Sequence, residues 1–494
     1  MKKELYRSRI KKALDKNVLE FLSSLKEDLW IAEEDIIGTE VHDIMLYEKN
    51  ILKKEEIKKI LGSLEKIKKK IKKGEIKLTG DFEDIHPFIE SYVIDDIGID
   101  IGGKIHTGRS RNDQVSVDLR LKIRKELNET SSKLFNFLDI LLDLSNKNLN
   151  TYMPLYTHLQ KAQLGLFSHY LNYYCSQILR VEERIDEIYK RINQNPLGAC
   201  AIGGTNINID RERTMELLGF DGLIENSIDA VSSRDYIIET MMLLSLLAIH
   251  ISRISEDLMI WSTKEFNFIK LDDKYCSVSS VMPQKRNPDS LEIIRAKSSN
   301  VISNLSTANL IIKAIPSGYF RDFQQLKPIL KHSFNLIQSI LVIITGIFST
   351  VKINKENMLE QIRDSYIIAL DLAELLVEDY EIPFRKAHQI VATLVKNSKT
   401  PEDLFNHEKI NELIREYSEK EINISNNEIN NLRNVKKTLE KRISQGSTSR
   451  KEVSAYFKSL KKRKENMYKN YLLRIENIKE ANSKRENLLN KLID

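Results

Sequence analysis

The chain has 494 residues, of which 30% are charged and 41% hydrophobic, a balance typical of a folded chain with a large buried core. Only 17 residues are Gly and nine are Pro, which argues against a loop-rich or all-β fold and favours long helices. The net charge is +6, but residues 450–494 hold 13 Lys or Arg against six Asp or Glu. The basic excess therefore belongs to the tail, which argues against general nucleic-acid binding.

Neither a targeting segment nor a membrane span is indicated. Residues 1–16 are charged and lack the apolar stretch of a signal peptide. The most apolar windows, 241–251 and 336–348, are interrupted by polar residues and are too short to cross a bilayer. Three widely spaced Cys without a Cys-x-x-Cys motif indicate neither a disulfide framework nor a zinc site. We expect a soluble, cytoplasmic protein without a membrane partner.

The first 108 residues are expected to form an N-terminal helical domain. A lysine-rich stretch, residues 53–77, contains apolar residues at helical spacing, beginning with Ile57, Ile60 and Leu61. We interpret its lysines as the solvated face of a helix.

Residues 109–153 contain neither Gly nor Pro, and apolar residues recur there every four positions from Val115 to Leu127. This pattern predicts a helix of about 35 residues, roughly 50 Å long at ~1.5 Å per residue. Rods of this length usually pack side by side in bundles. We assign residues 109–352 to a central long-helix bundle, and 353–494 to a C-terminal helical domain with a basic helical tail. The fold class is all-α, with three helical domains.

Three polar clusters interrupt this helical pattern. The first, residues 106–114, precedes the long helix and contains Arg109 and Arg111, whose guanidinium groups can bind carboxylates. The same segment could simply be a helix-capping loop. The second, residues 156–160, contains His158, which could be a general acid or base or a structural histidine.

The third cluster, residues 277–290, contains two prolines that prevent a helix between helical neighbours. A loop with paired serines, Lys285 and Asn287 is better explained as a binding or catalytic loop than as a linker. Its lysine and asparagine could stabilise negative charge on a carboxylate.

Together the clusters resemble the signatures of the fumarase/aspartase superfamily, and within it of the argininosuccinate lyases. Residues 279–288 are similar to the superfamily's SSxMPxKxNP loop, and residues 106–114 match the HTGRSRNDQ block of argininosuccinate lyases. Shorter similar segments extend the resemblance over about residues 20–455. The resemblance implies a homotetramer, with sites shared between subunits, that cleaves argininosuccinate reversibly to arginine and fumarate. It implies no metal and no organic cofactor.

The resemblance also implies roles for individual residues. Ser279 would exchange the Cβ proton of the substrate, and His158 would handle the proton at the departing nitrogen or assist a base. Either of the two could be the formal donor or acceptor. The residues matched to substrate-binding positions are Ser24, Arg111, Asn112, Thr157, Lys285, Asn287, Tyr319, Gln324 and Lys327.

The sequence departs from the family pattern at several positions. Val278 stands where a Gly usually precedes the paired serines, so closure of the loop could be slower. Leu155 replaces a common Gly, and Phe320 a usual Asn. Three alternatives remain open: a sister lyase releasing fumarate from another amine, a non-catalytic crystallin-like homologue, and additional nucleic-acid binding through the tail.

Overall fold

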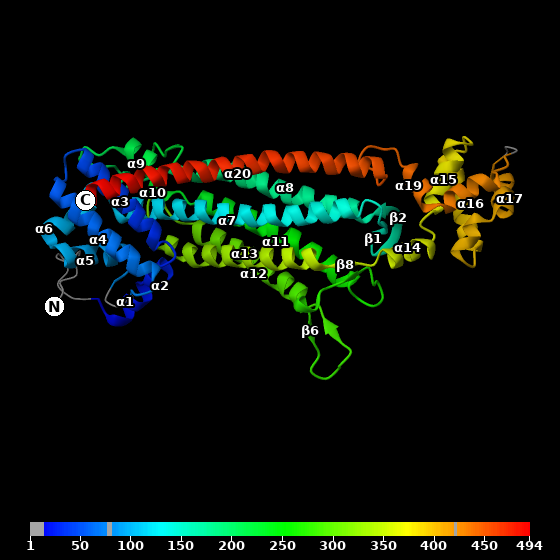
Figure 1. Cartoon of the computed structure of the whole chain (residues 1–494), viewed down its shortest axis with the longest axis horizontal. Helices are drawn as coiled ribbons and strands as arrows, with labels where there is room; N and C mark the ends of the chain where they lie inside the picture. The colour runs from blue at the N-terminus through cyan, green and yellow to red at the C-terminus, as the bar shows by residue number, and fades with distance from the viewer. Residues whose placement is uncertain (1–13, 77–81, 419–421) are drawn as a thin grey trace.

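The computed structural model describes residues 14–76, 82–418 and 422–494, and has the form of a long rod (Figure 1). The expectation that the chain has no signal peptide concerns the charged segment 1–16. This segment lies largely outside the described residues. Nearly all regular structure is helical, and the four sheets within the described residues have only two strands each. The expected all-α class is confirmed.

Short and medium helices form one end of the rod: α1 (Lys16–Leu22), α2 (Leu25–Asp28), α3 (Ala32–Glu48), α4 (Lys54–Lys72), α5 (Ile85–Ile97) and α6 (Ile99–Gly102). Helix α4 is the lysine-rich stretch, and its predicted apolar residues Ile57, Ile60 and Leu61 are fully buried. Helix α3 packs between α4 and the start of α7 and is buried along most of its length.

The middle of the rod is a bundle of α7 (Arg111–Lys147), α8 (Phe167–Ile192), α11 (Asp235–Trp261), α12 (Asp289–Ile312) and α13 (Leu326–Thr350). Two short helices, α9 (Arg211–Leu218) and α10 (Ser227–Ser232), lie in the connection from α8 to α11. Helix α7 has 37 residues, which confirms the predicted long helix. Its start is fixed because Ser110 and Asp113 form a reciprocal capping box.

Two antiparallel hairpins interrupt the bundle. Strands β1 (Tyr152–Thr157) and β2 (Gln160–Leu166) follow α7 at the end of the bundle distant from α1. Strands β6 (Ser277–Val278) and β7 (Arg286–Asn287) form the base of a loop that projects sideways from the rod (Figure 1). The remaining strands are the short β3 (Gln194–Asn195), β4 (Gly222–Leu223), β5 (Ile269–Lys270) and β8 (Lys352–Ile353).

A separate hydrophobic core supports the opposite end of the rod, which joins the bundle at β2. Its helices are α14 (Lys355–Arg363), α15 (Ala369–Glu378), α16 (Phe384–Asn397), α17 (His407–Tyr417), α18 (Asn426–Arg433) and α19 (Val435–Glu440). The last helix, α20 (Arg450–Ile493), leaves this domain and returns along α8 and α7 to the N-terminal end. The structure therefore differs from the expected division at 353–494, because the basic tail packs on the bundle.

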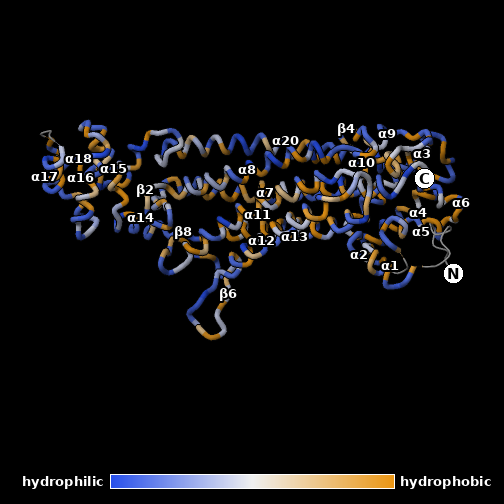
Figure 2. Tube along the Cα trace, turned by 180° about the vertical axis from the view of Figure 1, so that it is seen from behind, coloured by the Kyte–Doolittle hydropathy of each residue, from blue (hydrophilic) through white to orange (hydrophobic). Residues whose placement is uncertain are grey.

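Two helical segments, residues 235–261 and 321–350, are long and apolar enough by composition to cross a membrane. Only about half of each apolar window is buried within the chain, at 56% and 50%. Figure 2 shows apolar residues distributed along the bundle helices. Several large apolar side chains of α11–α13 are exposed: Met242, Ile249, Ile293, Ile302, Leu310, Val342 and Ile343.

Candidate active site

A buried ion pair organises the residues predicted to bind substrate at the N-terminal end. Lys327, in the first turn of α13, pairs with Asp28 at the end of α2. The hydroxyl of Ser24 donates to Asp28 Oδ2 over 2.8 Å, and Lys327 Nζ lies 3.4 Å from Ser24 Oγ. The structure thus brings Ser24 and Lys327 together, although they are 303 positions apart in the chain.

Two further predicted residues lie in the same cluster. Arg111 donates to Asp84 Oδ2 over 3.3 Å and lies 3.5 Å from Glu83. Gln324 donates from Nε2 to the carbonyl of Leu22, the last residue of α1, over 3.0 Å. Arg111 and Gln324 therefore flank the Lys327–Asp28 pair and offer donors for a carboxylate-bearing substrate.

Asn112 and Tyr319 complete this group. Asn112 donates from Nδ2 to the carbonyl of Ala201 over 2.8 Å, which anchors the start of α7 to the loop after α8. Tyr319 packs edge to face on Phe323, with ring centroids 5.9 Å apart. Burial raises the pKa of Tyr319, while the guanidinium of Arg234 acts in the opposite direction. Its phenol is therefore a neutral hydrogen-bonding group at neutral pH.

Behind the cluster lies a buried histidine that was not assigned a role. His86 Nδ1 is 3.0 Å from Asp35 Oδ1 and 3.7 Å from Asp118 Oδ2. Burial opposes the charged imidazolium, but the Asp35 carboxylate outweighs it, so the pKa of His86 is raised. For Asp35, burial is likewise outweighed, mainly by His86, and the pKa of this carboxyl is lowered. These groups therefore form an imidazolium–carboxylate pair in the protein interior.

The same three side chains form the one group of possible metal ligands found within the described part of the chain, with ligand atoms within 4.8 Å of one another. The protonated His86 already supplies the positive charge that a metal ion would supply there. We therefore interpret Asp35, His86 and Asp118 as structural support for the cluster.

The predicted pair Thr157 and His158 lies at the tip of the β1–β2 hairpin. Both side chains are exposed, and Thr157 pairs with Gln160 across the turn. His158 and Leu159 adopt left-handed backbone conformations, with φ of 55° and 57°, which closes the two-residue turn. The imidazole is thus presented outward from the end of the bundle.

The loop between β6 and β7 carries Ser279 and Lys285, and Asn287 lies on β7. The Ser279 hydroxyl oxygen accepts hydrogen bonds from the backbone N–H groups of Val281 (3.3 Å) and Met282 (3.0 Å). Its own N–H donates to the carbonyl of Lys285 over 3.3 Å, which closes the loop across its base. Two N–H groups aimed at one oxygen favour negative charge on that oxygen.

The three groups of predicted residues lie far apart in one chain. Asn112 begins α7, whereas Thr157 and His158 follow its end, and 37 residues at ~1.5 Å each make this helix about 55 Å long. The loop with Ser279 projects from the side of the rod between these two ends (Figure 1). A single chain therefore does not unite the predicted catalytic residues with the N-terminal group.

Sequence reasoning missed Asp28 as a member of the site. This residue is fully buried and joins Ser24, Lys327 and the backbone N–H of Ile85. It stands in a helical stretch without a recognisable motif, so no local signal marked it. His86 had a signal, since it ends residues 83–86, one of the short segments similar to the superfamily.

Comparisons with known proteins identify the fold and the family. A lyase family model matches residues 8–303, and a model of the argininosuccinate lyase C-terminal domain matches residues 366–453. Among solved structures, EDDS lyase in complex with formate superposes with a TM-score of 0.88 at 27% identity, covering 96% of this chain and 94% of that one. A class II fumarase from Schistosoma mansoni has the same fold, with a TM-score of 0.69 at 16% identity, covering 83% and 90%. The fold and the family model define a lyase of the fumarase/aspartase type.

Curated relatives narrow the class further. Argininosuccinate lyase from Nitrosopumilus maritimus is 44% identical over 392 residues, which cover 79% of this chain and 80% of that protein. Argininosuccinate lyase from Methanococcus maripaludis is 41% identical over 487 residues, or 98% of this chain and 99% of that protein. The chain belongs to the argininosuccinate lyase family, whose members are carbon–nitrogen lyases.

Proposed function

We propose that the protein cleaves argininosuccinate reversibly to L-arginine and fumarate, the last step of arginine biosynthesis. The observation that carries this proposal is the projecting loop in which Ser279 Oγ accepts two backbone N–H groups. An oxygen held in this way is suited to accept a weakly acidic proton. Lys285 and Asn287 stand on the same loop, where a substrate carboxylate can be bound.

The proposed reaction is a β-elimination. Ser279, in the alkoxide form that the N–H groups of Val281 and Met282 favour, accepts the Cβ proton next to a carboxylate. This gives a neutral hydroxyl and a dianionic aci-carboxylate that Lys285 and Asn287 stabilise. The C–N bond then breaks, its electron pair leaves with the departing nitrogen of the guanidinium group, and His158 donates the proton that this nitrogen takes up. Fumarate and arginine are released, and neither redox change nor co-reactant is needed. Ser24, Arg111, Asn112, Thr157, Tyr319, Gln324 and Lys327 bind the substrate.

This chemistry requires residues from more than one chain, and we propose a homotetramer with shared active sites. About 55 Å of α7 separates Asn112 from the hairpin that carries His158. The exposed apolar side chains of α11–α13, such as Ile249 and Leu310, provide a surface by which bundles of several copies can pack together. Side-by-side packing of bundles brings ends and loops of different chains together.

We further propose that the protein acts in the cytoplasm on a small-molecule substrate, without a membrane or nucleic-acid partner. The contacts of the basic tail support the proposal that nucleic acid is not a partner, because several of its cations pair with acidic residues of the bundle. Examples are Arg463 with Glu183 (2.8 Å) and Lys464 with Asp139 (2.7 Å). These pairs reduce the charge that the tail offers to a polyanion.

A second candidate is a related lyase that releases fumarate from another amine. The specific observation in its favour is the close structural similarity to EDDS lyase, with a TM-score of 0.88. Against it stands the HTGRSRNDQ block, which this chain retains at residues 106–114. A crystallin-like, non-catalytic homologue is the third candidate, and the retention of Ser279, His158 and Lys285 argues against it.

The deciding experiment is ultraviolet detection of fumarate after argininosuccinate is added to the purified protein, with adenylosuccinate and aspartate in parallel. We expect fumarate from argininosuccinate alone. Fumarate from another substrate would favour the second candidate. No fumarate from any substrate in a folded oligomer would favour the non-catalytic one.

A further inference from the structure

The basic helix α20 buries two arginines in acidic surroundings. The first, Arg474, donates to Glu182 (2.8 Å) and Asp186 (2.8 Å) of α8 and to Ser131 (3.0 Å) of α7. A buried guanidinium is costly unless it is paired, and these contacts pair it on two sides. Arg474 therefore fastens the middle of α20 to the bundle.

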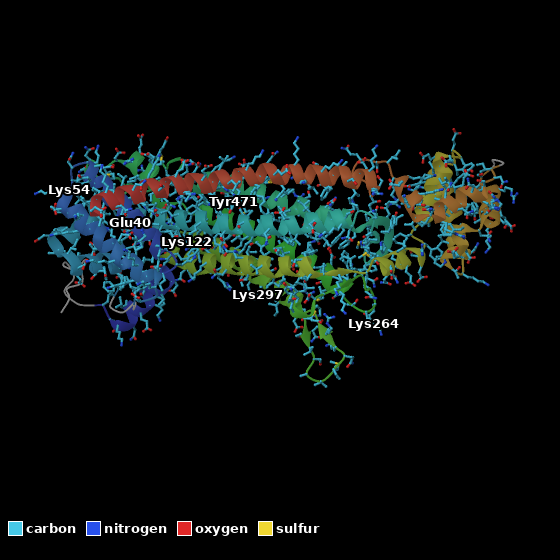
Figure 3. The ribbon with its side chains drawn as sticks, viewed as in Figure 1. Glu40, Lys54, Lys122, Lys264, Lys297 and Tyr471 are labelled. Carbon is cyan, nitrogen blue, oxygen red and sulfur yellow. The ribbon has the colours of Figure 1, made fainter. Side chains whose placement is uncertain are left out.

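The second arginine reaches the N-terminal end instead. Arg485 Nε lies 3.8 Å from Oε2 of Glu40 on α3, and Lys68 of α4 lies 3.0 Å from the other oxygen of this carboxylate. Glu40, labelled in Figure 3, is fully buried. Its two ion pairs bring α3, α4 and α20 together at one carboxyl group. Burial raises the pKa of Glu40 to about 7, although Lys68 and Arg485 oppose this effect. Lys68 is hydrogen-bonded to this carboxylate, and Arg485 adds an ion pair at 3.8 Å without a hydrogen bond.

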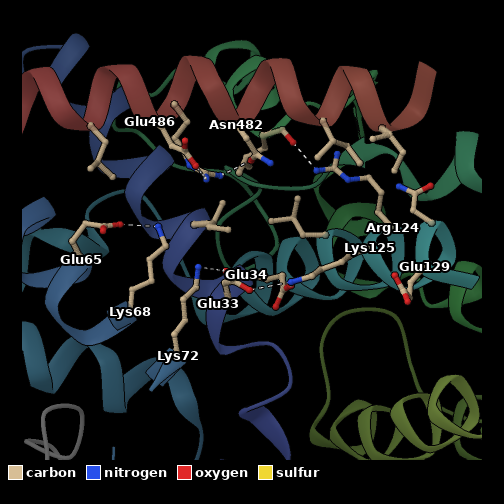
Figure 4. A pocket seen from close by; sticks show the side chains of 18 of the residues that line it. Glu33, Glu34, Glu65, Lys68, Lys72, Arg124, Lys125, Glu129, Asn482 and Glu486 are labelled. Carbon is tan, nitrogen blue, oxygen red and sulfur yellow. Dashed lines mark hydrogen bonds and ion pairs between the residues drawn. The ribbon is translucent and has the colours of Figure 1, made fainter. Parts of the chain in front are cut away.

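Apolar packing also contributes beside this junction, because Ala481, Leu489 and Leu492 of α20 are buried. A cavity of about 700 Å³ lies between α20 and helices α3, α4 and α7 (Figure 4). Its charged side chains pair across the gap: Glu33 lies 2.8 Å from Lys72 and 3.0 Å from Lys125. Because these charges neutralise one another, we interpret the cavity as a packing gap and not as a ligand site. The Arg485–Glu40 ion pair is thus a charged contact between the end of α20 and α3, in addition to the apolar packing.

The opposite side of α3 contacts the segment that leads into α7. The hydroxyl of Thr39, the residue next to Glu40, accepts a hydrogen bond of 2.9 Å from Arg109 Nη1. His42 Nε2 lies 2.8 Å from the carbonyl of Thr107. Asp35, one turn earlier, pairs with His86 and accepts from Gln114. Helix α3 is thus a rigid connection between α20 and residues 106–114.

We propose that Arg485 is a positioning residue, which acts through Glu40 and α3 to hold Arg111 and Asn112 where they bind substrate. The basic tail thereby gains a function in the reaction that its sequence did not reveal. This inference rests on the proposed substrate-binding role of residues 106–114. It requires no contact between Arg485 and the substrate.

The test compares two buried arginines of one helix. We expect Arg485→Met to raise KM for argininosuccinate about fivefold or more, with kcat within about twofold of the unmodified protein. Arg474→Met is the matched control: it should lower the melting temperature and leave KM unchanged, because Arg474 does not contact α3. Arg485→Lys should recover most of the affinity, since it restores a cation near Glu40. Glu40→Gln should resemble Arg485→Met and provides an independent variant with little change of shape.

Two results would overturn the inference. One is an unchanged KM in Arg485→Met and Glu40→Gln. The other is an equal rise of KM in Arg474→Met, which would mean that loosening α20 anywhere has the same effect. Asn112→Ala, measured in parallel, separates this failure from failure of the proposed site. If Asn112→Ala leaves KM unchanged, the binding role of residues 106–114 is wrong. If Asn112→Ala raises KM but Arg485→Met does not, only the positioning role of Arg485 is refuted.

Discussion

Lys327 and Asp28 form a buried ion pair, although 299 positions separate them in the chain. The pair joins the first turn of α13 to the end of α2 and places Ser24 beside the ammonium group. The position of the short N-terminal helices relative to the bundle is therefore fixed where substrate is proposed to bind.

Replacing Lys327 by Met should impair both stability and binding. Asp28 would remain as an uncompensated buried charge, which typically costs about 3–5 kcal/mol. We expect a lower melting temperature in thermal unfolding and a raised KM in steady-state assays. The double variant Asp28→Asn with Lys327→Met should unfold at a higher temperature than Lys327→Met alone. If the double variant is less stable than the single one, the two side chains do not act as a pair.

Ser279→Ala should remove the proposed proton acceptor. Because general acid–base catalysis typically contributes about 100-fold or more, kcat should fall by at least that factor while KM stays close to normal. Ser280→Ala, at the neighbouring exposed position, is the control and should lose little activity. Stopped assays of fumarate release measure both variants. Near-normal turnover in Ser279→Ala would contradict the assigned role.

The exposed apolar face of α11–α13 should drive assembly. Leu310 is 63% exposed on α12, and an arginine there would be buried without a partner if the faces of several chains pack together. We expect Leu310→Arg to dissociate the oligomer in size-exclusion chromatography with light scattering, and to abolish activity. Leu473→Arg is the control, because Leu473 is 56% exposed on α20, away from α12 and α13. Equal effects of both changes would exclude this face as the interface.

Glu182 should make stability depend on pH. Burial raises its pKa to about 7 despite the neighbouring Arg474, so the folded state keeps a proton that the unfolded state releases near 4.5. The contribution of Glu182 is therefore fully present below about pH 4.5 and is lost as the pH rises through about 7. Urea unfolding at pH 5 and pH 7 checks this, with Glu182→Gln for comparison. As the pH rises from 5 to 7, the free energy of unfolding of Glu182→Gln should increase relative to that of the unmodified protein. If the difference in unfolding free energy between the two proteins is the same at both pH values, the prediction is contradicted.

Local patterns were sufficient to predict the longest elements. The absence of Gly and Pro together with the four-residue apolar spacing predicted α7, and Ser110 with Asp113 caps it where the polar cluster ends. The sequence contains no signal that predicts the end of α11 at Trp261, because residues 262–282 also lack Gly and Pro. There, contacts between distant strands replace the helix: β5 pairs with β8.

Long-range contacts explain what the sequence did not reveal. Helix α20 was assigned to the C-terminal domain because it follows it in the chain, but its arginines find Glu182 and Glu40 far earlier in the sequence. Asp28 likewise depends on Lys327, a partner that no spacing rule connects to it. The predicted site residues were found through motifs, whereas their separation into three groups required the structure.

The most direct test of a shared active site is complementation between two impaired variants, one in substrate binding and one in catalysis, assayed at an argininosuccinate concentration well below the KM of Asn112→Ala. Asn112→Ala and Ser279→Ala are purified separately, mixed in equal amounts, dissociated and reassembled, and fumarate release is measured. If different chains supply these residues to one site, random reassembly leaves about a quarter of the sites intact, and activity should return to about that fraction. If the mixture stays as inactive as its components although mixed oligomers form, each site is built within a single chain and our account is wrong.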